Sequence, residues 1–220
     1  MTILVTGFQP FDNRSVNASW IAANSLASTN NVIALELPVV WGTPWTELSS
    51  AIEQHKPEIV ISMGEGRQGW FDIETVARNG RSERQDNLGQ LPTGPIKAAG
   101  PATIDATISA QPLQQSLLDL GYPIRISEDA GAFLCEETLY SLELLKQNFD
   151  CLTTVVFVHL PPFETILTAN SESGICDTVF LQKFASALLD NVRKMPFECD
   201  SIVTVTRRFH VVVLVAFLAI

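Results

Sequence analysis

The sequence predicts one α/β domain in which a mostly parallel, twisted sheet is covered by helices on both faces. Short apolar runs rich in β-branched residues alternate with longer stretches of helical periodicity, which is typical of such a sheet. No internal repeat or low-complexity linker divides the 220 residues, a length that suits one compact core. We therefore expect a single domain over residues 1–220.

Five apolar runs are the strand candidates. They combine β-branched residues with flanking Gly, Pro or polar residues, and they are ILVTGF (3–8), VIALELPV (32–39), EIVISMG (58–64), IRIS (124–127) and TVVFVHLP (154–161).

Helical stretches lie between these runs. SWIAANSLAS begins with Ser19, a suitable N-cap, and TISAQPLQQSLLDLGY contains Gly121 where a helix C-cap is expected. Three further helices are predicted in TELSSAIEQH, CEETLYSLELLKQNF and DTVFLQKFASALLDNVRK.

The segment from Asn79 to Thr103 has no periodic apolar pattern and is rich in Gly, Pro and polar residues. It predicts a long surface loop. Loops of this length inside compact domains are either functional or disordered, so this one is a candidate for lining a site.

The chain is acidic, with 24 Asp and Glu against 14 Lys and Arg and a net charge of −10. An acidic surface repels phosphate backbones, so we expect no nucleic-acid partner. The four cysteines form no CxxC pair and no cluster with histidine, and the N-terminus does not read as a secretory signal. We therefore expect no zinc site, no disulfide scaffold and a cytoplasmic location.

The last residues, HVVVLVAFLAI (210–220), are almost wholly apolar and β-branched. The run is shorter than the roughly 20 residues that a membrane-spanning helix needs. Three interpretations stay open: a buried strand or oligomer contact, a membrane or aggregation-prone tail, and an altered reading of the C-terminus.

Cys135 is the first candidate catalytic residue. An extended segment and a Gly turn precede it in SEDAGAFLCEETLY, and a helix is predicted to start there. Unpaired N–H groups and the helix dipole would stabilise a thiolate and a developing oxyanion at that position. The alternative is a buried structural cysteine, since free cysteines are often fully buried.

His159 and Glu74 are its candidate partners. His159 ends a predicted strand, where catalytic groups of parallel sheets gather; a structural histidine is the alternative. Glu74 lies in the apolar-flanked WFDIETVARN, where a buried carboxylate needs a partner, either a histidine that it orients or Arg78 in an ordinary salt bridge. His55, in a polar run, and His210, in the apolar tail, are poorer candidates.

The turn TGFQPF after the first strand places Phe8 and Phe11 around Pro10. Aromatic residues in such a turn commonly pack in the core. They would also suit the walls of a slot for a flat, uncharged ring.

Several motifs, in register from residue 2 to about residue 162, resemble the pyroglutamyl peptidase I family of cysteine peptidases. VTGFQPF is similar to the family's TGFxPFG, and VNASW is similar to its NPSW-type segment. DIETVARN resembles the stretch around the catalytic glutamate, DAGAFLC the nucleophile motif AGTFVC, and FVHLP the histidine motif FIHxP. DNLGQLP and GPAT resemble two further family elements.

The resemblance implies a three-layer α/β/α sandwich without metal or organic cofactor, acting on peptides with an N-terminal pyroglutamate and assembling as a homodimer or homotetramer. It implies a Cys135–His159–Glu74 triad, with Arg84 near the oxyanion. It also implies that Phe8, Phe11, Asn17 and Phe133 line the pyroglutamate pocket.

This sequence departs from the family pattern at several places. Asp12 stands where the family has glycine, Glu65 lies in the pocket segment GEGRQG where glutamine is usual, and Glu136 replaces an asparagine after the nucleophile. A carboxylate beside a thiolate opposes its charge unless it is solvated or paired. The chain after about Arg207 has no counterpart in the family.

The predicted reaction is hydrolysis of the bond after an N-terminal pyroglutamyl residue through a thioester on Cys135. Two alternatives stay open. Glu65 and Asp12 allow a thiol amidase that acts on another small amide or lactam, and Glu136 with the unusual tail allows an inactive protein that binds a small metabolite.

Overall fold

The predicted parallel sheet is present in the computed structural model, which describes residues 1–168 and 174–195. Within those residues, one sheet has six strands in the order β2-β1-β3-β8-β4-β7. The strands are β1 (Ile3–Phe8), β2 (Val32–Leu37), β3 (Ile59–Glu65), β4 (Phe71–Glu74), β7 (Ile124–Ser127) and β8 (Thr154–Leu160). Neighbouring strands are parallel except β4 and β8, which are antiparallel. The mostly parallel sheet is therefore confirmed.

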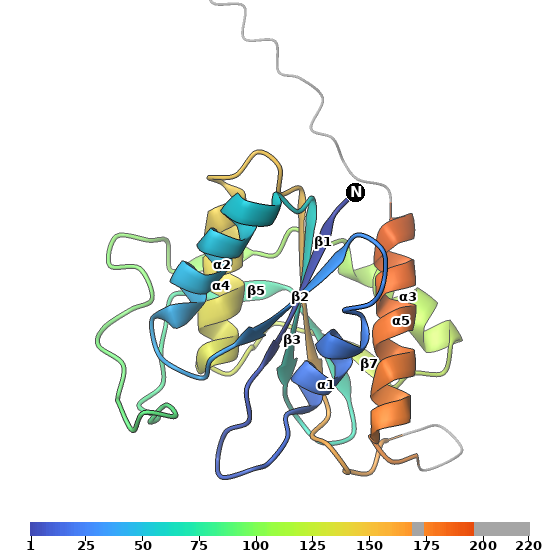
Figure 1. The fold of residues 1–220 in the computed structure, drawn as a ribbon. Helices are drawn as coiled ribbons and strands as arrows, with labels where there is room; N and C mark the ends of the chain where they lie inside the picture. Colours follow the sequence, from blue (N-terminus) through green and yellow to red (C-terminus); the bar gives the residue numbers. More distant parts are fainter. Residues whose placement is uncertain (169–173, 196–220) are drawn as a thin grey trace, which may run out of the picture.

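Helices cover both faces of this sheet (Figure 1). One face carries α1 (Ala18–Ser25), α3 (Ala110–Asp119) and α5 (Thr178–Lys194), and the other carries α2 (Thr43–His55) and α4 (Leu134–Lys146). Each face buries its own cluster of apolar side chains against the helices. The three-layer α/β/α arrangement is confirmed, whereas the single-domain boundary stays a prediction.

Three short strands were not predicted from the sequence. β4 carries Asp72 and Glu74 within four residues, and its side chains are nevertheless buried. The other two, β5 (Val76–Arg78) and β6 (Thr103–Asp105), form a separate antiparallel pair. Their lengths of three and four residues give too little pattern to distinguish a strand from a loop.

The first helix begins earlier than predicted, at Ala18. Its N-cap is Asn17, whose side chain accepts a hydrogen bond from the Ser19 N–H, so the prediction of Ser19 as the cap was wrong. The Ser19 hydroxyl instead accepts a hydrogen bond from the Phe8 N–H, at 2.9 Å. A Cβ atom at Gly7 would collide with the Ser19 carbonyl oxygen, so this close approach requires glycine. Together these contacts fix the loop after β1 against α1.

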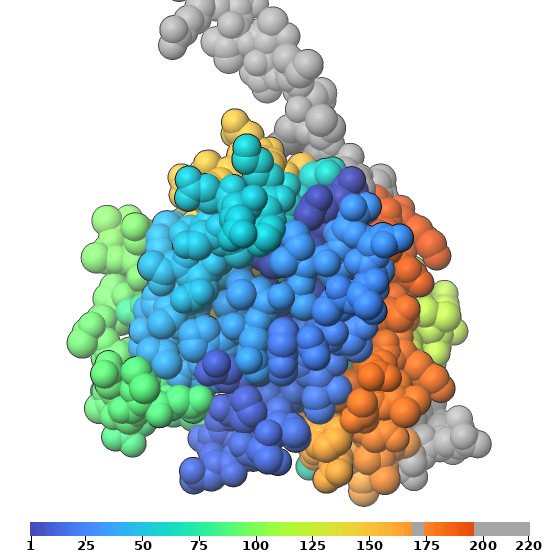
Figure 2. Space-filling model, in the orientation of Figure 1, coloured from blue at the N-terminus to red at the C-terminus, as the bar shows by residue number. Residues whose placement is uncertain are grey.

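The predicted C-terminal end of α3 lies close to the observed one. The cap of α3 is Leu120, and Gly121 follows it with a φ of 88°, the left-handed conformation that favours glycine. The loop predicted from residue 79 forms no helix or strand until β6 begins at Thr103. In the space-filling view this loop, drawn in green, projects from one side of the molecule (Figure 2).

Candidate active site

All nine residues predicted for the site lie around one pocket. The pocket opens at the carboxyl ends of β1, β3 and β8, where ligands of parallel sheets commonly bind. From the predicted set, its lining includes Cys135, His159, Glu74, Arg84, Phe8, Phe11, Asn17, Glu65 and Phe133. The structure thus brings together residues that are up to 151 positions apart in sequence, from Phe8 to His159.

The carboxylate and the imidazole are in direct contact. Glu74 Oε1 lies 2.7 Å from Nδ1 of His159, and both side chains are buried. Antiparallel pairing of β4 with β8 places Asp72 opposite His159, and Glu74 follows two residues later on the same strand, within reach of the imidazole. The contact fixes the ring so that Nδ1–H donates to the carboxylate and Nε2 is left to accept a proton.

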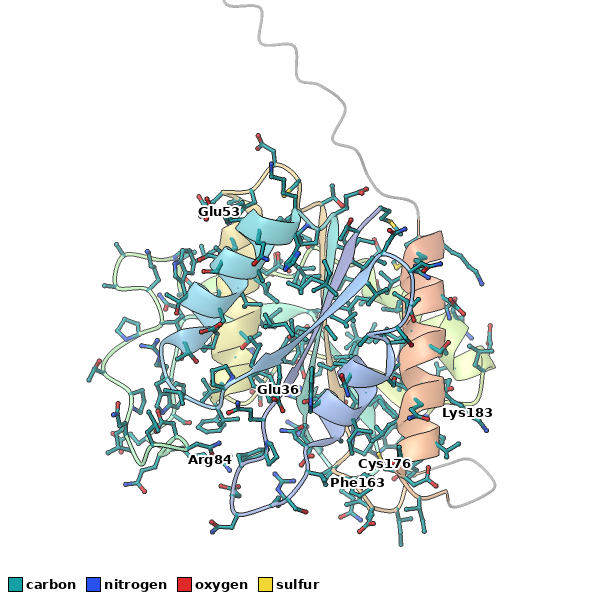
Figure 3. The ribbon with its side chains drawn as sticks, in the orientation of Figure 1. Glu36, Glu53, Arg84, Phe163, Cys176 and Lys183 are labelled. Carbon is teal, nitrogen blue, oxygen red and sulfur yellow. The ribbon has the colours of Figure 1, made fainter. Side chains whose placement is uncertain are left out.

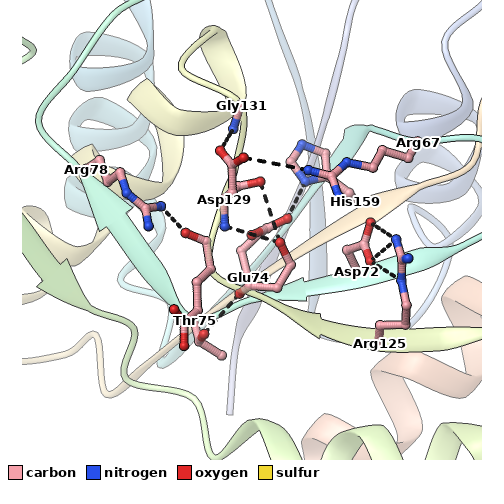
Figure 4. Close-up of polar contacts among 11 residues, drawn as sticks. Arg67, Asp72, Glu74, Thr75, Arg78, Arg125, Asp129, Gly131 and His159 are labelled. Atoms are coloured by element: carbon pink, nitrogen blue, oxygen red, sulfur yellow. Dashed lines mark hydrogen bonds and ion pairs between the residues drawn. The ribbon is translucent and has the colours of Figure 1, made fainter.

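The alternative salt bridge between Glu74 and Arg78 is not formed. Arg78 donates through its guanidinium to the Glu128 carbonyl oxygen instead (Figure 4). The second oxygen of Glu74, Oε2, is buried with no hydrogen-bond partner among the described residues. The contact with His159 therefore offsets the free-energy cost of burying the Glu74 carboxylate.

Cys135 is the second residue of α4, after the extended N-cap Phe133. Gly131 and Ala132 just before it have φ values of 85° and 53°, so a tight turn in the left-handed region delivers the cysteine to the helix start. The first N–H groups of an α-helix have no acceptor within the helix. They and the positive end of the dipole are available to a thiolate and to an oxyanion at this point.

The thiol and the imidazole share the space above Gly64. A Cβ atom at Gly64 would lie 2.6 Å from Cys135 Sγ and 3.2 Å from His159 Cδ2, the ring carbon bonded to Nε2. His159 is also hydrogen-bonded to that sulfur, and since Nδ1 contacts Glu74, the nitrogen that faces the sulfur is Nε2. Glycine leaves both groups free to approach each other.

Replacing Gly64 by alanine is expected to lower kcat by about 100-fold or more, because the new methyl group would displace the sulfur, and misplacement by about 1 Å has an effect of that size. Steady-state rates and thermal unfolding of the variant test this. Gly80 is the matched control, since a Cβ there would meet no atom within 4 Å. A Gly64→Ala protein with the rate of the Gly80→Ala protein would contradict the placement of the thiol.

Charge determines the protonation of His159. Burial alone would lower its pKa, but the negative charge of a Cys135 thiolate, the hydrogen bond with that sulfur and the Glu74 carboxylate together raise the pKa above its usual value. The imidazolium form is thus stabilised between two anionic groups. An imidazolium in contact with a thiolate is the activated state of a cysteine nucleophile.

Glu136, the unexpected residue after the nucleophile, is buried and accepts a hydrogen bond from the Arg78 N–H at 2.6 Å. Burial raises its pKa to about 7, against the lowering effects of that hydrogen bond and of the Arg78 charge. Below that pH the side chain is largely neutral. It then does not oppose a negative sulfur on the neighbouring residue.

The other two departures from the family pattern are paired with arginines. Asp12 pairs with Arg84, and the buried Glu65 side chain pairs with Arg14 and accepts a hydrogen bond from the Ala18 N–H at 2.9 Å. Figure 3 shows Arg84 beside the loop that follows β1. A carboxylate at Glu65 requires a counter-ion, but nothing in the sequence indicated that Arg14 supplies it.

Arg84 lines the pocket, and its guanidinium pairs with Asp12. Its guanidinium is 4.4 Å from the ring centre of Phe133 and 5.3 Å from that of Phe11. These contacts and the Asp12 ion pair account for its position. A role for Arg84 at the oxyanion therefore stays a prediction.

Aromatic rings form one wall of the pocket. Phe11 and Phe133 have ring centres 6.3 Å apart, and Trp41 packs edge-on against Phe133 at 5.0 Å. Asn17 also lines the pocket, but its side chain is bound to the chain itself, to Ser19 and to the Gln9 carbonyl oxygen. Asn17 thus holds the shape of the loop, and the flat apolar wall comes from the phenylalanines.

Among residues 1–168 and 174–195, the other histidine and the other two cysteines lie outside the pocket lining. His55 ends α2, and Cys151 and Cys176 are free thiols outside the pocket lining. Burial raises the pKa of Cys176 to about 12, so this thiol is unreactive. His210, Cys199 and the apolar run 210–220 lie outside the described residues.

Within residues 1–168 and 174–195, no group of three His, Cys, Asp or Glu side chains is placed to hold a metal ion. Over the same residues, no helix has the length and apolar character to cross a membrane.

A thiol at a helix N-terminus, an imidazole beside it and a buried carboxylate on the far ring nitrogen define a cysteine-type hydrolase on an α/β/α fold. Residues 1–192 match the pyroglutamyl peptidase family. The chain belongs to this family, which confirms the resemblance seen in its motifs, and it is a cysteine-type omega-peptidase.

Relatives and solved structures agree with this assignment. Pyrrolidone-carboxylate peptidase of Gloeobacter violaceus is 39% identical over 170 residues, covering 73% of this chain and 82% of that protein. The enzyme of the same name from Klebsiella pneumoniae is 37% identical over 166 residues, covering 72% and 77%. The crystal structure of pyroglutamyl peptidase I from Bacillus amyloliquefaciens superimposes with a TM-score of 0.78 at 24% identity, covering 88% of this chain and 95% of that one, and supports the fold.

Proposed function

We propose that this protein hydrolyses the peptide bond after an N-terminal pyroglutamyl residue, with Cys135 as nucleophile, His159 as general base and then acid, and Glu74 as the residue that orients the imidazole. The observation that carries the proposal is the convergence of these three side chains in one pocket, with Glu74 Oε1 2.7 Å from His159 Nδ1. The names of the relatives support the choice of substrate.

The proposed reaction has two steps. Nε2 of His159 takes the Cys135 proton, and the sulfur attacks the pyroglutamyl carbonyl carbon. N–H groups at the start of α4, with Arg84, stabilise the oxyanion. The C–N bond then breaks as the imidazolium protonates the leaving amine, which gives a thioester. Water, deprotonated by His159, attacks the thioester and releases pyroglutamate and the thiol.

The pocket suits a lactam better than a free N-terminus. Pyroglutamate has no charged amine, and the walls formed by Phe8, Phe11 and Phe133 present a flat apolar surface to its ring. The carboxylate of Glu65 is neutralised by Arg14 and hydrogen-bonded by Ala18, so it is not free to anchor an ammonium group. The Glu65 carboxylate therefore does not serve as the anchor that the charged N-terminus of an ordinary aminopeptidase substrate needs.

A panel of fluorogenic amides tests this assignment. We expect hydrolysis of the pyroglutamyl amide and rates at least 100-fold lower for the prolyl, glutaminyl and N-acetylalanyl amides, because a site that matches polar groups discriminates strongly against analogues that lack them. Faster hydrolysis of a non-lactam amide would support the alternative thiol amidase. Absence of hydrolysis of every amide would support the inactive binding protein.

We also propose that the enzyme acts in the cytoplasm as a homodimer or homotetramer. Free thiols at Cys135, Cys151 and Cys176 suit a reducing compartment. Light scattering of the purified chain measures the assembly state, and a monomer at micromolar concentration would contradict the oligomer.

A further inference from the structure

A second hollow lies beside the catalytic pocket and is lined by three arginines, Arg67, Arg78 and Arg125. Its walls come from β4, β5 and β7 and from the turn that leads to the nucleophile. Figure 4 shows the side chains of the three arginines. No residue of this hollow was singled out from the sequence as part of a binding site.

The hollow adjoins the catalytic pocket. Arg67, Asp72 and Asp129 line both spaces. At the boundary, Arg67 and Asp129 form an ion pair with a long separation of 3.6 Å, and each side chain is 65% exposed. Pairs of this kind contribute little free energy, so a substrate can displace one partner at small cost.

The boundary between the two spaces also lies beside His159, the residue that protonates the leaving group. Arg67 follows Gly66, whose Cβ position would be 2.7 Å from the Cβ of His159. His159 protonates the amine of the departing peptide, so the residues after the scissile bond leave the pocket near this imidazole. The adjoining hollow lies on this side of the pocket, because Arg67 lines both spaces.

We propose that this hollow binds the part of a pyroglutamyl peptide that follows the cleaved bond, and that Arg78 with Arg67 recognises a carboxylate there. The carboxylate comes either from an acidic side chain or from the C-terminus of a short peptide. This inference rests on the proposed function, because it concerns a subsite of the same reaction.

Arg78 carries the argument for a carboxylate. Its guanidinium donates to a neutral acceptor, the Glu128 carbonyl oxygen, and within residues 1–168 and 174–195 it has no ion pair. Arg125, by contrast, is held by two hydrogen bonds to Asp72 and lies 4.7 Å from the ring centre of Trp70. A guanidinium offers five donors in a planar fork that fits a carboxylate, so Arg78 retains donors for a ligand.

The negative groups around the hollow limit the strength of binding. Asp72 is neutralised by Arg125, and Asp129 is engaged by Arg67 and by the Gly131 N–H. The exposed side chain of Glu128 is the remaining acidic residue of the lining, and its charge opposes a second carboxylate. The buried Glu136, outside the lining, also interacts with the Arg78 charge. We therefore expect a preference of about fivefold rather than an absolute requirement.

The test compares kcat/KM for three peptides: pyroglutamyl-Ala-Ala amide as the neutral reference, the same peptide with a free C-terminus, and pyroglutamyl-Ala-Asp amide. Wild type is expected to cleave at least one of the two carboxylate peptides about fivefold faster than the reference, chiefly through a lower KM. A preference for the free acid identifies a C-terminal carboxylate as the ligand, and a preference for the Asp peptide identifies a side chain.

Variants then assign the preference to the hollow. For each protein, we compare kcat/KM for a carboxylate peptide with kcat/KM for the neutral reference as a ratio. A general loss of activity then cancels. Arg78→Gln is expected to reduce this ratio to about one, and Glu128→Gln to increase it. If Arg78→Gln does not fold, the Glu128→Gln ratio and a fall of the wild-type ratio with added salt give the same test.

A ratio near one in wild type, or an unchanged ratio in both variants, would contradict the proposed carboxylate subsite. In either case, rapid cleavage of the neutral peptide would leave the proposed function intact. Failure to cleave any of the three peptides would instead contradict the proposed function.

Discussion

Replacement of Cys135 by serine is expected to lower the turnover of a pyroglutamyl amide by about a million-fold, the loss seen when the nucleophile of a catalytic triad is removed. Serine keeps the size of the side chain and its place in the first turn of α4. It does not keep the nucleophile, because the hydroxyl ionises far less readily than a thiol and His159 is placed to pair with a thiolate.

Initial rates for wild type and Cys135→Ser, measured with the same enzyme preparation protocol, check this prediction. Cys151→Ser is the matched control, because Cys151 is also a half-buried free thiol but does not line the pocket. We expect the control to keep the wild-type rate. Equal rates for wild type and Cys135→Ser would contradict the assignment of Cys135 as the nucleophile.

Replacement of Glu74 by glutamine is expected to lower kcat by about 10,000-fold with a much smaller change in KM. Glutamine preserves the shape of the buried side chain but removes its charge and can present its NH₂ group to Nδ1, which selects the wrong tautomer of His159. The pKa of His159 should also fall, because the carboxylate is one of the groups that raise it.

Glu143→Gln is the matched control for Glu74→Gln. Glu143 is likewise a buried carboxylate, it lies on α4 and accepts a hydrogen bond from the Thr107 N–H, and it is not part of the pocket lining. Steady-state kinetics of both variants, with circular dichroism to verify folding, provide the measurement. A Glu74→Gln enzyme within tenfold of the control would show that Glu74 does not orient the catalytic base.

The sequence predicted the long strands and the helices well because their apolar patterns are long and regular. β1 and β7 have the expected bounds, and β8 differs by one residue at its end. β4 was missed since its acidic residues suggest exposure, whereas Arg125 and His159 compensate them in the folded chain. Those partners are 53 and 85 positions away in sequence, and local pattern does not reveal them.

For the site, the motifs indicated which residues converge, but not how their charges are balanced. The Glu74–His159 contact was predicted, and the pocket contains every residue named in advance. The ion pairs of Arg14 and Arg84 and the arginine-lined hollow were not predicted. They depend on loop conformations, such as the positive φ values of Asp12 and Asn13, that set the direction of each side chain.

Catalysis in this protein depends on one thiol that attacks a substrate held in the aromatic pocket. The most direct test is inactivation with a pyroglutamyl chloromethyl ketone, followed by mass mapping of the modified residue. The structure predicts stoichiometric loss of activity with the label on Cys135 and protection by free pyroglutamate. A label on Cys151 or Cys176, or full activity after labelling of Cys135, would contradict the assignment of Cys135 as the nucleophile.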